Sequence, residues 1–197
     1  MIMNNVTKKT LTVLVVACLM AVIPQWSYSQ KARVQQKVPQ KTLILQNGTL
    51  GPVKVGKAIG NLPKQYAGLY DNYTYTRNNH EDDEMDGPWL EEYYIFTKAG
   101  KKIFRVNIDD GKVSSITLLS GSSSFIKTPD GIYVGYPAQK LYREKKMSWE
   151  YYMYEAFTWA TKGQYTYSVD RDNAITNNMD QLKGFKANAK VCEITHF

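Results

Sequence analysis

The sequence predicts an α+β fold made of two tandem repeats, each a short helix pair followed by an antiparallel β-meander. Two pairs of matching segments predict this class. KVSSITLL at 112–119 returns as KVCEITHF at 190–197, and PVKVGKAIGNL at 52–62 has its counterpart in GIYVGYPAQKL at 131–141. Matching blocks that keep the same order along a chain indicate an internal repeat rather than a chance likeness of one strand.

An apolar run near the N-terminus predicts a targeting segment. Lys8 and Lys9 precede LTVLVVACLMAVI, which is shorter than the roughly 20 apolar residues that span a membrane. Ser27 and Ser29 supply small residues for signal peptidase, so we expect a signal peptide over 1–29 and a periplasmic or secreted mature chain. VVAC resembles a lipoprotein box, and lipid anchoring through Cys18 is the alternative.

Removal of the signal peptide changes the charge and the cysteine count. The formal net charge of +7 falls to about +5 because two lysines are lost, and Cys192 becomes the one cysteine of the mature chain. No internal disulfide can form, so the core and its hydrogen bonds must hold the fold. An exported chain seldom meets nucleic acid, so the basic balance favours a cell-envelope protein or a glycan as partner, with no nucleic acid.

The mature chain is expected to begin with a polar tether over 30–46, in which TLIL at 42–45 is a candidate first strand. The first repeat, 47–120, opens with apolar residues spaced three and four apart, which is typical of helix. Pro63 is expected to divide this helix into two short turns. The second repeat, 121–197, is expected to follow the same path.

Strands follow in both repeats. FRVNID at 104–109 and YTYSVD at 165–170 alternate apolar and polar residues, which predicts half-buried antiparallel strands. Asp109-Asp110-Gly111 predicts a tight hairpin turn into KVSSITLL, and Lys98-Ala99-Gly100 and Lys162-Gly163 predict two more. Ile116 and Ile194, at matching places in the two final strands, are expected to be buried.

A tandem helix-and-meander arrangement resembles the fold of the beta-lactamase inhibitor proteins and of the small outer-membrane assembly lipoproteins. VKVGKAIGNL and GKVSSITLL are similar to the segments that lead into the first helix and form the final strand in those families. The resemblance implies a protein that binds a partner with a curved sheet. The stabilising disulfides of the inhibitors are absent, so no inhibitory contact residue carries over. A single closed β-barrel of lipocalin type is the alternative architecture.

The sequence supports no reaction class. Cys192 and His196 lie four residues apart on a predicted strand, so about 13 Å separates them, which excludes a thiol nucleophile with its base and argues against a zinc site in this strand. We identify no cofactor motif, no catalytic residue and no metal site in this pattern, and we do not expect an enzyme.

The acidic stretch NNHEDDEMDG at 78–87 has the alternate spacing with which a calcium loop opens, at Asp82, Glu84 and Asp86. The twelfth position of such a loop should be glutamate, but counting from Asp82 it is Tyr93. The motif is therefore incomplete, and the stretch is interpreted as a solvated insertion, with calcium binding left open.

Aromatic residues supply the remaining hypothesis. The chain has 15 tyrosines, several of them in clusters near tryptophans. Strand packing alone favours tyrosine, but rigid amphipathic rings are also enriched at protein interfaces. The candidate binding residues are Trp89, Tyr93, Tyr94, Trp149, Tyr152 and Trp159.

These observations together predict an exported, non-enzymatic binding module that engages a protein partner through a curved, aromatic-rich sheet. The alternative is a glycan-binding or small-ligand-binding protein with an aromatic cleft between the repeats.

Overall fold

The computed structural model of the chain describes residues 42–81, 88–123, 125–144, 147–151, 155–177, 179 and 181–197. The chain divides into two units, 1–38 and 39–197, and every described residue belongs to the second. The predicted signal peptide, Cys18 with its alternative lipid anchor, and most of the predicted tether lie outside the described residues.

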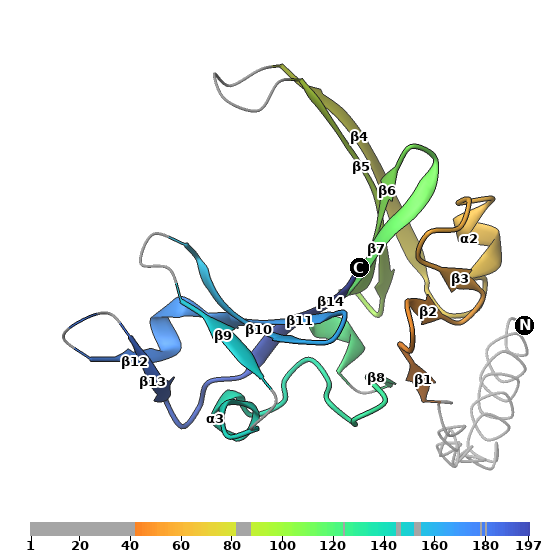
Figure 1. Cartoon of the computed structure of the whole chain (residues 1–197). Helices are drawn as coiled ribbons and strands as arrows, with labels where there is room; N and C mark the ends of the chain where they lie inside the picture. Colours follow the sequence, from red (N-terminus) through yellow and green to blue (C-terminus); the bar gives the residue numbers. More distant parts are fainter. Residues whose placement is uncertain are drawn as a thin grey trace, which may run out of the picture. The chain divides into compact units, whose positions relative to one another are not determined.

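An eight-stranded sheet, antiparallel at every step, forms the centre of the fold, in the order β4-β5-β6-β7-β14-β11-β10-β9 (Figure 1). Its strands are β4 (Asn72–His80), β5 (Trp89–Lys98), β6 (Lys101–Asp109), β7 (Lys112–Leu118), β9 (Ser148–Glu150), β10 (Phe157–Lys162), β11 (Tyr165–Asp170) and β14 (Val191–His196). The sheet is open, with β4 and β9 at its edges. The closed barrel considered as the alternative architecture is therefore not what forms.

Shorter elements surround this sheet. β1 (Leu43–Ile44) pairs in parallel with β8 (Ile126–Lys127), and β1 lies within the TLIL segment. Two further short pairs are β2 (Thr49–Leu50) with β3 (Val53–Lys54), and β12 (Ala174–Thr176) with β13 (Leu182–Phe185). The helical elements of the described residues are α2 (Leu62–Gln65), α3 (Ala138–Tyr142) and the 3₁₀ turns η2 (Ser120–Ser122) and η3 (Arg171–Asn173).

The predicted fold class is wrong. The described chain is mainly β, and helices of four and five residues stand where two helix pairs were expected. The reason is visible in the backbone around α2: Gly56, Gly60 and Gly68 have φ angles of 78°, 53° and 85°. Glycine adopts this left-handed region freely, and a residue there ends a helix. The apolar spacing that suggested a helix instead belongs to a chain that turns repeatedly.

The strand predictions are confirmed. FRVNID lies in β6 and YTYSVD forms β11, and the turn between β6 and β7 has φ of 46° at Asp110 and 67° at Gly111, as a tight hairpin with two left-handed central residues requires. Ile116 and Ile194 are both fully buried. The local alternation of residue types was therefore enough to locate these strands.

The strands KVSSITLL and KVCEITHF lie side by side at the middle of the sheet. Thr117 pairs with Thr195, and their hydroxyl oxygens lie 3.1 Å apart. Each strand is also held at its start in the same way: Gly56 N donates to Val113 O at 2.8 Å, and Gly135 N donates to Val191 O at 2.7 Å. β7 and β14 therefore join the two halves of the chain into one sheet.

One face of the sheet carries the core, and we call it the covered face. Phe96, Phe104, Leu118, Ile194 and Tyr167 form one row across five strands of it, and all are fully buried. α2 and the residues that follow it pack here, since the ring of Tyr66 lies 5.1 Å from Phe96 and 4.7 Å from Phe104.

The other half of the covered face is packed by α3. Tyr142 of α3 lies 5.6 Å from the ring of Trp149, which shares this face because it pairs with Ala160 beside Tyr167. Both helices therefore cover the same side of the sheet. The opposite side is called the open face below.

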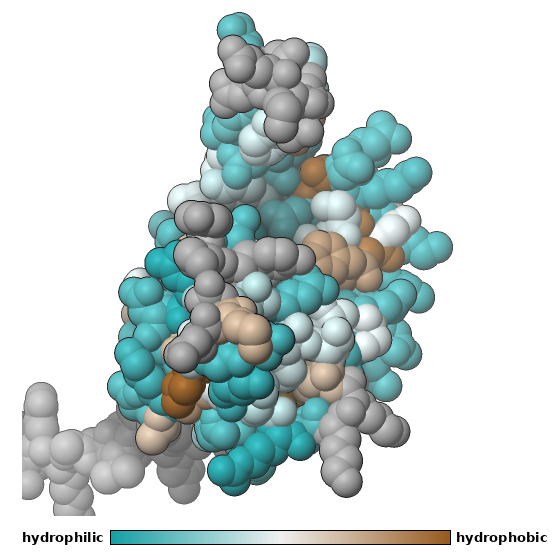
Figure 2. Space-filling model, turned by 60° about the vertical axis from the view of Figure 1, so that its left-hand side comes forward, coloured by the Kyte–Doolittle hydropathy of each residue, from teal (hydrophilic) through white to brown (hydrophobic). Residues whose placement is uncertain are grey.

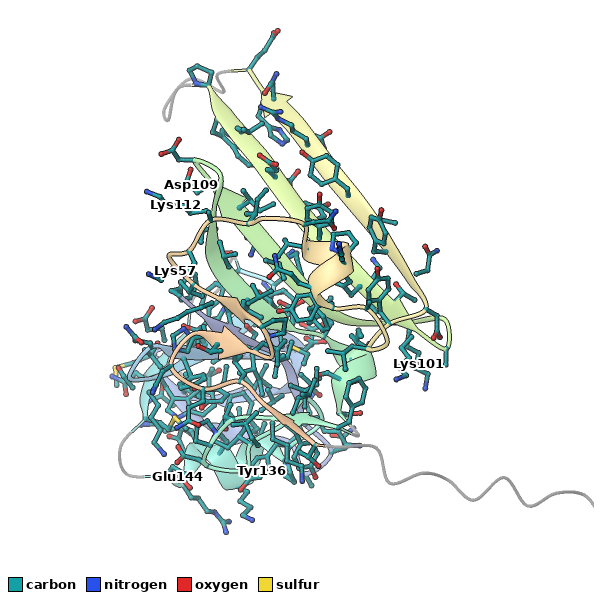
Figure 3. All side chains as sticks on the ribbon, turned by 90° about the vertical axis from the view of Figure 1, so that its right-hand side faces the viewer. Lys57, Lys101, Asp109, Lys112, Tyr136 and Glu144 are labelled. Carbon is teal, nitrogen blue, oxygen red and sulfur yellow. The ribbon has the colours of Figure 1, made fainter. Side chains whose placement is uncertain are left out.

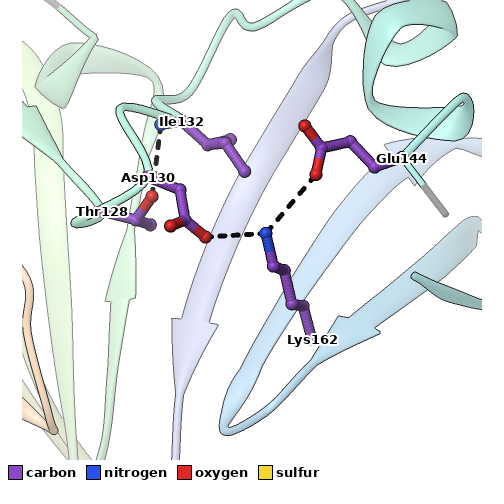
Figure 4. A network of polar contacts seen from close by, with 5 residues as sticks. All are labelled: Thr128, Asp130, Ile132, Glu144 and Lys162. Carbon is purple, nitrogen blue, oxygen red and sulfur yellow. Dashed lines mark hydrogen bonds and ion pairs between the residues drawn. The ribbon is translucent and has the colours of Figure 1, made fainter. Parts of the chain in front are cut away.

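A polar network fixes the loop between the two halves (Figure 4). Lys162 Nζ lies 2.8 Å from Asp130 Oδ2 and 3.4 Å from Glu144 Oε2, so it ties the end of β10 to this loop and to the residues after α3. Thr128 Oγ1 accepts a hydrogen bond from Ile132 N within the same loop. The hydrogen bond to Asp130 raises the pKa of Lys162, but both carboxylates are largely exposed, so the pairs stabilise the fold only modestly.

Candidate functional site

A row of side chains crosses the open face from β10 to the edge strand β4. It runs through Thr161, Thr166, Thr195, Thr117, Arg105, Ile95 and Thr74, which follow one another by direct cross-strand pairing. Except for buried Thr117, these residues are half-buried or exposed. The open face is therefore a broad, mixed surface of hydroxyl, aliphatic and cationic groups.

Arg105 is the central charged group of this face. Its guanidinium carbon lies 5.8 Å from the centroid of the Tyr93 ring, which is within the range of a cation–π interaction. Its Nε atom is buried and has no hydrogen-bond partner. Next to this pair, Asn107 Nδ2 donates to Ser115 Oγ at 2.7 Å. The arrangement places a cation against an aromatic ring, on the same face as a fixed polar pair.

The structure divides the candidate aromatic residues between the two faces. Tyr93 and Trp159 lie on the open face, and Trp89 shares the face of Tyr93 because it is four residues away on β5. Tyr94 and Trp149 lie on the covered face, and Tyr152 is outside the described residues. Of the five described candidates, the structure places only Tyr93 against Arg105.

Arg105, Asn107 and the threonine pair were not among the candidates taken from the sequence. The signal for Arg105 and Asn107 was present, since both alternate with the buried residues of FRVNID and must point to the opposite side of that strand. The pairing of Thr117 with Thr195 could be recognised only by knowing that β7 and β14 are neighbours.

Cys192 and His196 do not come together as a catalytic pair. The thiol of Cys192 donates to Ser168 O at 3.0 Å, beside a bulge between β11 and β14. Burial raises the pKa of this thiol to about 11, so it stays protonated near neutral pH and is a poor nucleophile. His196 is buried against Tyr165 at 4.7 Å between ring centroids, and burial lowers its pKa.

Within the described ranges, no group of three histidine, cysteine or acidic side chains is placed to hold a metal ion. Residues 82–87 are outside these ranges, so the structure does not test the calcium hypothesis for Asp82, Glu84 and Asp86. Nor does any helix of the described residues combine the length and the apolar character needed to cross a bilayer.

Two hollows lie beside η2. The larger, of about 490 Å³, is lined in part by Tyr133, Lys190 and Cys192, and the smaller, of about 320 Å³, by Lys98, Lys101 and Phe125. Both are also lined by Ser120 and Ser123, and neither lining includes an acidic residue. Figure 3 shows Lys101, which lines the smaller hollow, at one end of β6, while Asp109 and Lys112 lie at the other end, away from it. The hollows are therefore cationic, and they lie where the two halves of the chain meet.

Comparison with known proteins defines the fold and no more. No protein-family model and no curated protein matches the chain. One solved structure that matches is the crystal structure of the uncharacterized protein yfeY from Escherichia coli, with a TM-score of 0.54 and 15% sequence identity over 79% of this chain and 99% of that chain. The chain therefore shares the fold of an uncharacterised protein.

Proposed function

We propose that the mature chain is an exported, non-enzymatic binding module that engages a protein of the cell envelope through the open face. The observation that carries the proposal is Arg105, a half-buried cation held against Tyr93 in the middle of that face. Arginine and tyrosine are among the residues most enriched at binding hot spots. A carboxylate on a partner would pair with the positive charge of this half-buried side chain.

The architecture supports the same proposal. Among the described residues, both helices pack on the covered face, and neither covers the open face. The resemblance of VKVGKAIGNL and GKVSSITLL to the beta-lactamase inhibitor proteins points to a sheet face as the binding element. The positive charge expected of the mature chain favours a partner with an acidic surface.

An internal repeat, part of the same proposal, would account for the width of this face. Ala58 bridges to Lys112 in the first half, and Pro137 bridges to Lys190 in the second, so the same contact occurs in both. A duplication of one four-stranded unit, joined through its final strands β7 and β14, gives a sheet twice as wide as either half alone.

The test is capture from periplasmic extract with the immobilised mature chain, 30–197. We expect a retained protein that binds at least about tenfold more weakly to Arg105→Glu, because reversing the central charge repels an acidic partner. Lys183→Glu makes the same change of charge on β13 and should bind like the wild type. Thermal melting must show that both variants fold. A folded Arg105→Glu variant with unchanged binding, or an extract from which nothing is retained, would contradict the proposal.

The cationic hollows favour a second candidate, a glycan or small ligand that carries negative charge. Lys98, Lys101 and Lys190 line these hollows together with serine hydroxyls and the rings of Phe125 and Tyr133, and such groups bind acidic sugars by charge, hydrogen bonds and stacking. Binding of a uronic-acid oligosaccharide that is lost in Lys98→Glu but kept in Arg105→Glu would support this candidate over the first.

A further inference from the structure

The outer edge of β4 is long and lacks the usual protection of an exposed strand. β4 pairs with β5 over all nine residues without a shift of register, so no bulge bends it. Its sequence, NYTYTRNNH, contains neither proline nor lysine, which commonly protect such edges. The opposite edge strand, β9, has only three residues. The two edges therefore differ in their capacity to pair with another strand.

Apolar surface collects at the same edge. Tyr73, Tyr75, Trp89 and Leu90 are 42%, 45%, 53% and 42% exposed, although all belong to the β4–β5 hairpin. Figure 1 shows this hairpin reaching beyond the rest of the sheet, and Figure 2 shows one side of the molecule, on which hydrophilic residues predominate with scattered apolar groups among them. The ring centroids of Phe96 and Tyr73 lie 6.2 Å apart. The aromatic core therefore extends from buried Phe96 to Tyr73, which is exposed to solvent.

We propose that β4 pairs antiparallel with β4 of a second copy of this chain, centred on Thr76, so that two sheets join into one. The backbone limits the possible registers. Tyr73 N donates to Asn72 Oδ1 at 2.8 Å, which turns the Tyr73 amide away from β5. In an antiparallel strand the outward groups alternate, so those of Tyr75, Arg77 and Asn79 also point outward. Outward groups meet outward groups whenever the centre falls on a residue, and Thr76, the midpoint of β4, is the centre that pairs all nine residues.

The side chains are self-complementary in this register. Tyr75 of one copy faces Arg77 of the other, which suits a cation–π contact, and Tyr73 faces Asn79. Arg77 pairs across its own hairpin with Glu92, whose Oε1 accepts a hydrogen bond from the Tyr75 hydroxyl at 2.8 Å. Each edge therefore offers a cation and an anion close to its midpoint. Within β4 no two like charges face each other, and Asp71 lies opposite Glu81 only beyond the ends of the strand. This balance of charge favours a second copy over a partner of one sign.

The dimer would also enlarge the open face. Antiparallel pairing of two identical edges places the two-fold axis perpendicular to the sheet, so both open faces lie on the same side. The inference does not depend on the proposed function, because it concerns an edge of the sheet and not its face.

The test is the oligomeric state of the mature chain, measured by sedimentation from low to high micromolar concentration. We expect a monomer–dimer equilibrium. Tyr75→Lys should weaken it at least about tenfold, because the new lysine faces Arg77 of the other copy. Thr74→Lys adds the same charge on the opposite side of β4, where it faces the uncharged Asn78 of the other copy, and should weaken the dimer much less.

A mixing experiment tests the register itself. Arg77→Glu should also weaken the dimer, since it places a carboxylate beside Glu92. Mixed with Tyr75→Lys, it should form a heterodimer, because the lysine introduced in one copy faces the glutamate introduced in the other only when β4 pairs about Thr76. A wild-type chain that stays monomeric at every concentration, equal effects of Tyr75→Lys and Thr74→Lys, or no recovery on mixing would overturn the inference.

Discussion

Deletion of residues 190–197 is expected to abolish the cooperative fold. β14 lies between β7 and β11, so the deletion removes a strand from the middle of the sheet and not from its edge. Val191, Ile194 and His196 are 1%, 0% and 2% exposed, and β14 pairs with neighbours on both sides. The lost ladder bonds and apolar burial exceed the roughly 5–15 kcal/mol of stability of a typical domain.

Thermal melting followed by circular dichroism measures this effect. Removal of Phe197 alone is the matched control, because this residue is 61% exposed and lies beyond the end of β14. We expect the control to melt like the full mature chain and the longer deletion to show no transition. A longer deletion that melts at the same temperature would show that the strand KVCEITHF is not structural.

Tyr66→Ala is expected to lower the free energy of unfolding by about 3–5 kcal/mol, the range found for a large aromatic residue removed from a core. Tyr66 is fully buried and packs edge-on against Phe96, and its hydroxyl donates to Leu50 O at 3.0 Å. Tyr66 therefore holds the end of α2 and, through Leu50, β2 against the covered face. Tyr66→Phe keeps the ring and should cost only about 1 kcal/mol, for the lost hydrogen bond.

Urea unfolding checks both values, with Tyr73→Phe as a control at an exposed tyrosine. A Tyr66→Ala variant as stable as the wild type would contradict the packing described here. Alkaline pH gives a second readout. Burial raises the pKa of Tyr66, so the stability it contributes is present below the ordinary tyrosine pKa of 10.0 and is lost as the pH rises above that value. Tyr66→Phe should lose less stability over this alkaline range.

The sequence located strands better than helices, for a physical reason. Alternation in a strand such as β6 reports directly which side chains are buried, because the strand has one covered and one open face. The apolar spacing around α2 does not show which secondary structure buries these side chains. Burial of Leu62 and Tyr66 needs only that the chain approach the core at those points, and the left-handed glycines show that it does so through turns.

The candidate site was predictable only in part. Tyr93 and Tyr94 are adjacent on one strand, so they had to point to opposite faces, and the sequence could have shown that they cannot share a site. The pairing of Tyr93 with Arg105 required knowing that β5 and β6 are neighbours in this register. The junction of Thr117 with Thr195 depends on contacts between distant parts of the chain, which local patterns do not record.

Hydroxyl-radical footprinting of the mature chain, with and without the captured partner, is the most direct test of the claim that the open face is the binding surface. Tyr93 and Trp159 report on the open face, Tyr133 reports on the larger hollow, and Met179, which is 72% exposed, serves as a reference. We predict that the partner slows oxidation of Tyr93 and Trp159 and leaves Tyr133 and Met179 unchanged. Protection of Tyr133 with Tyr93 and Trp159 oxidised at their full rates would contradict the account.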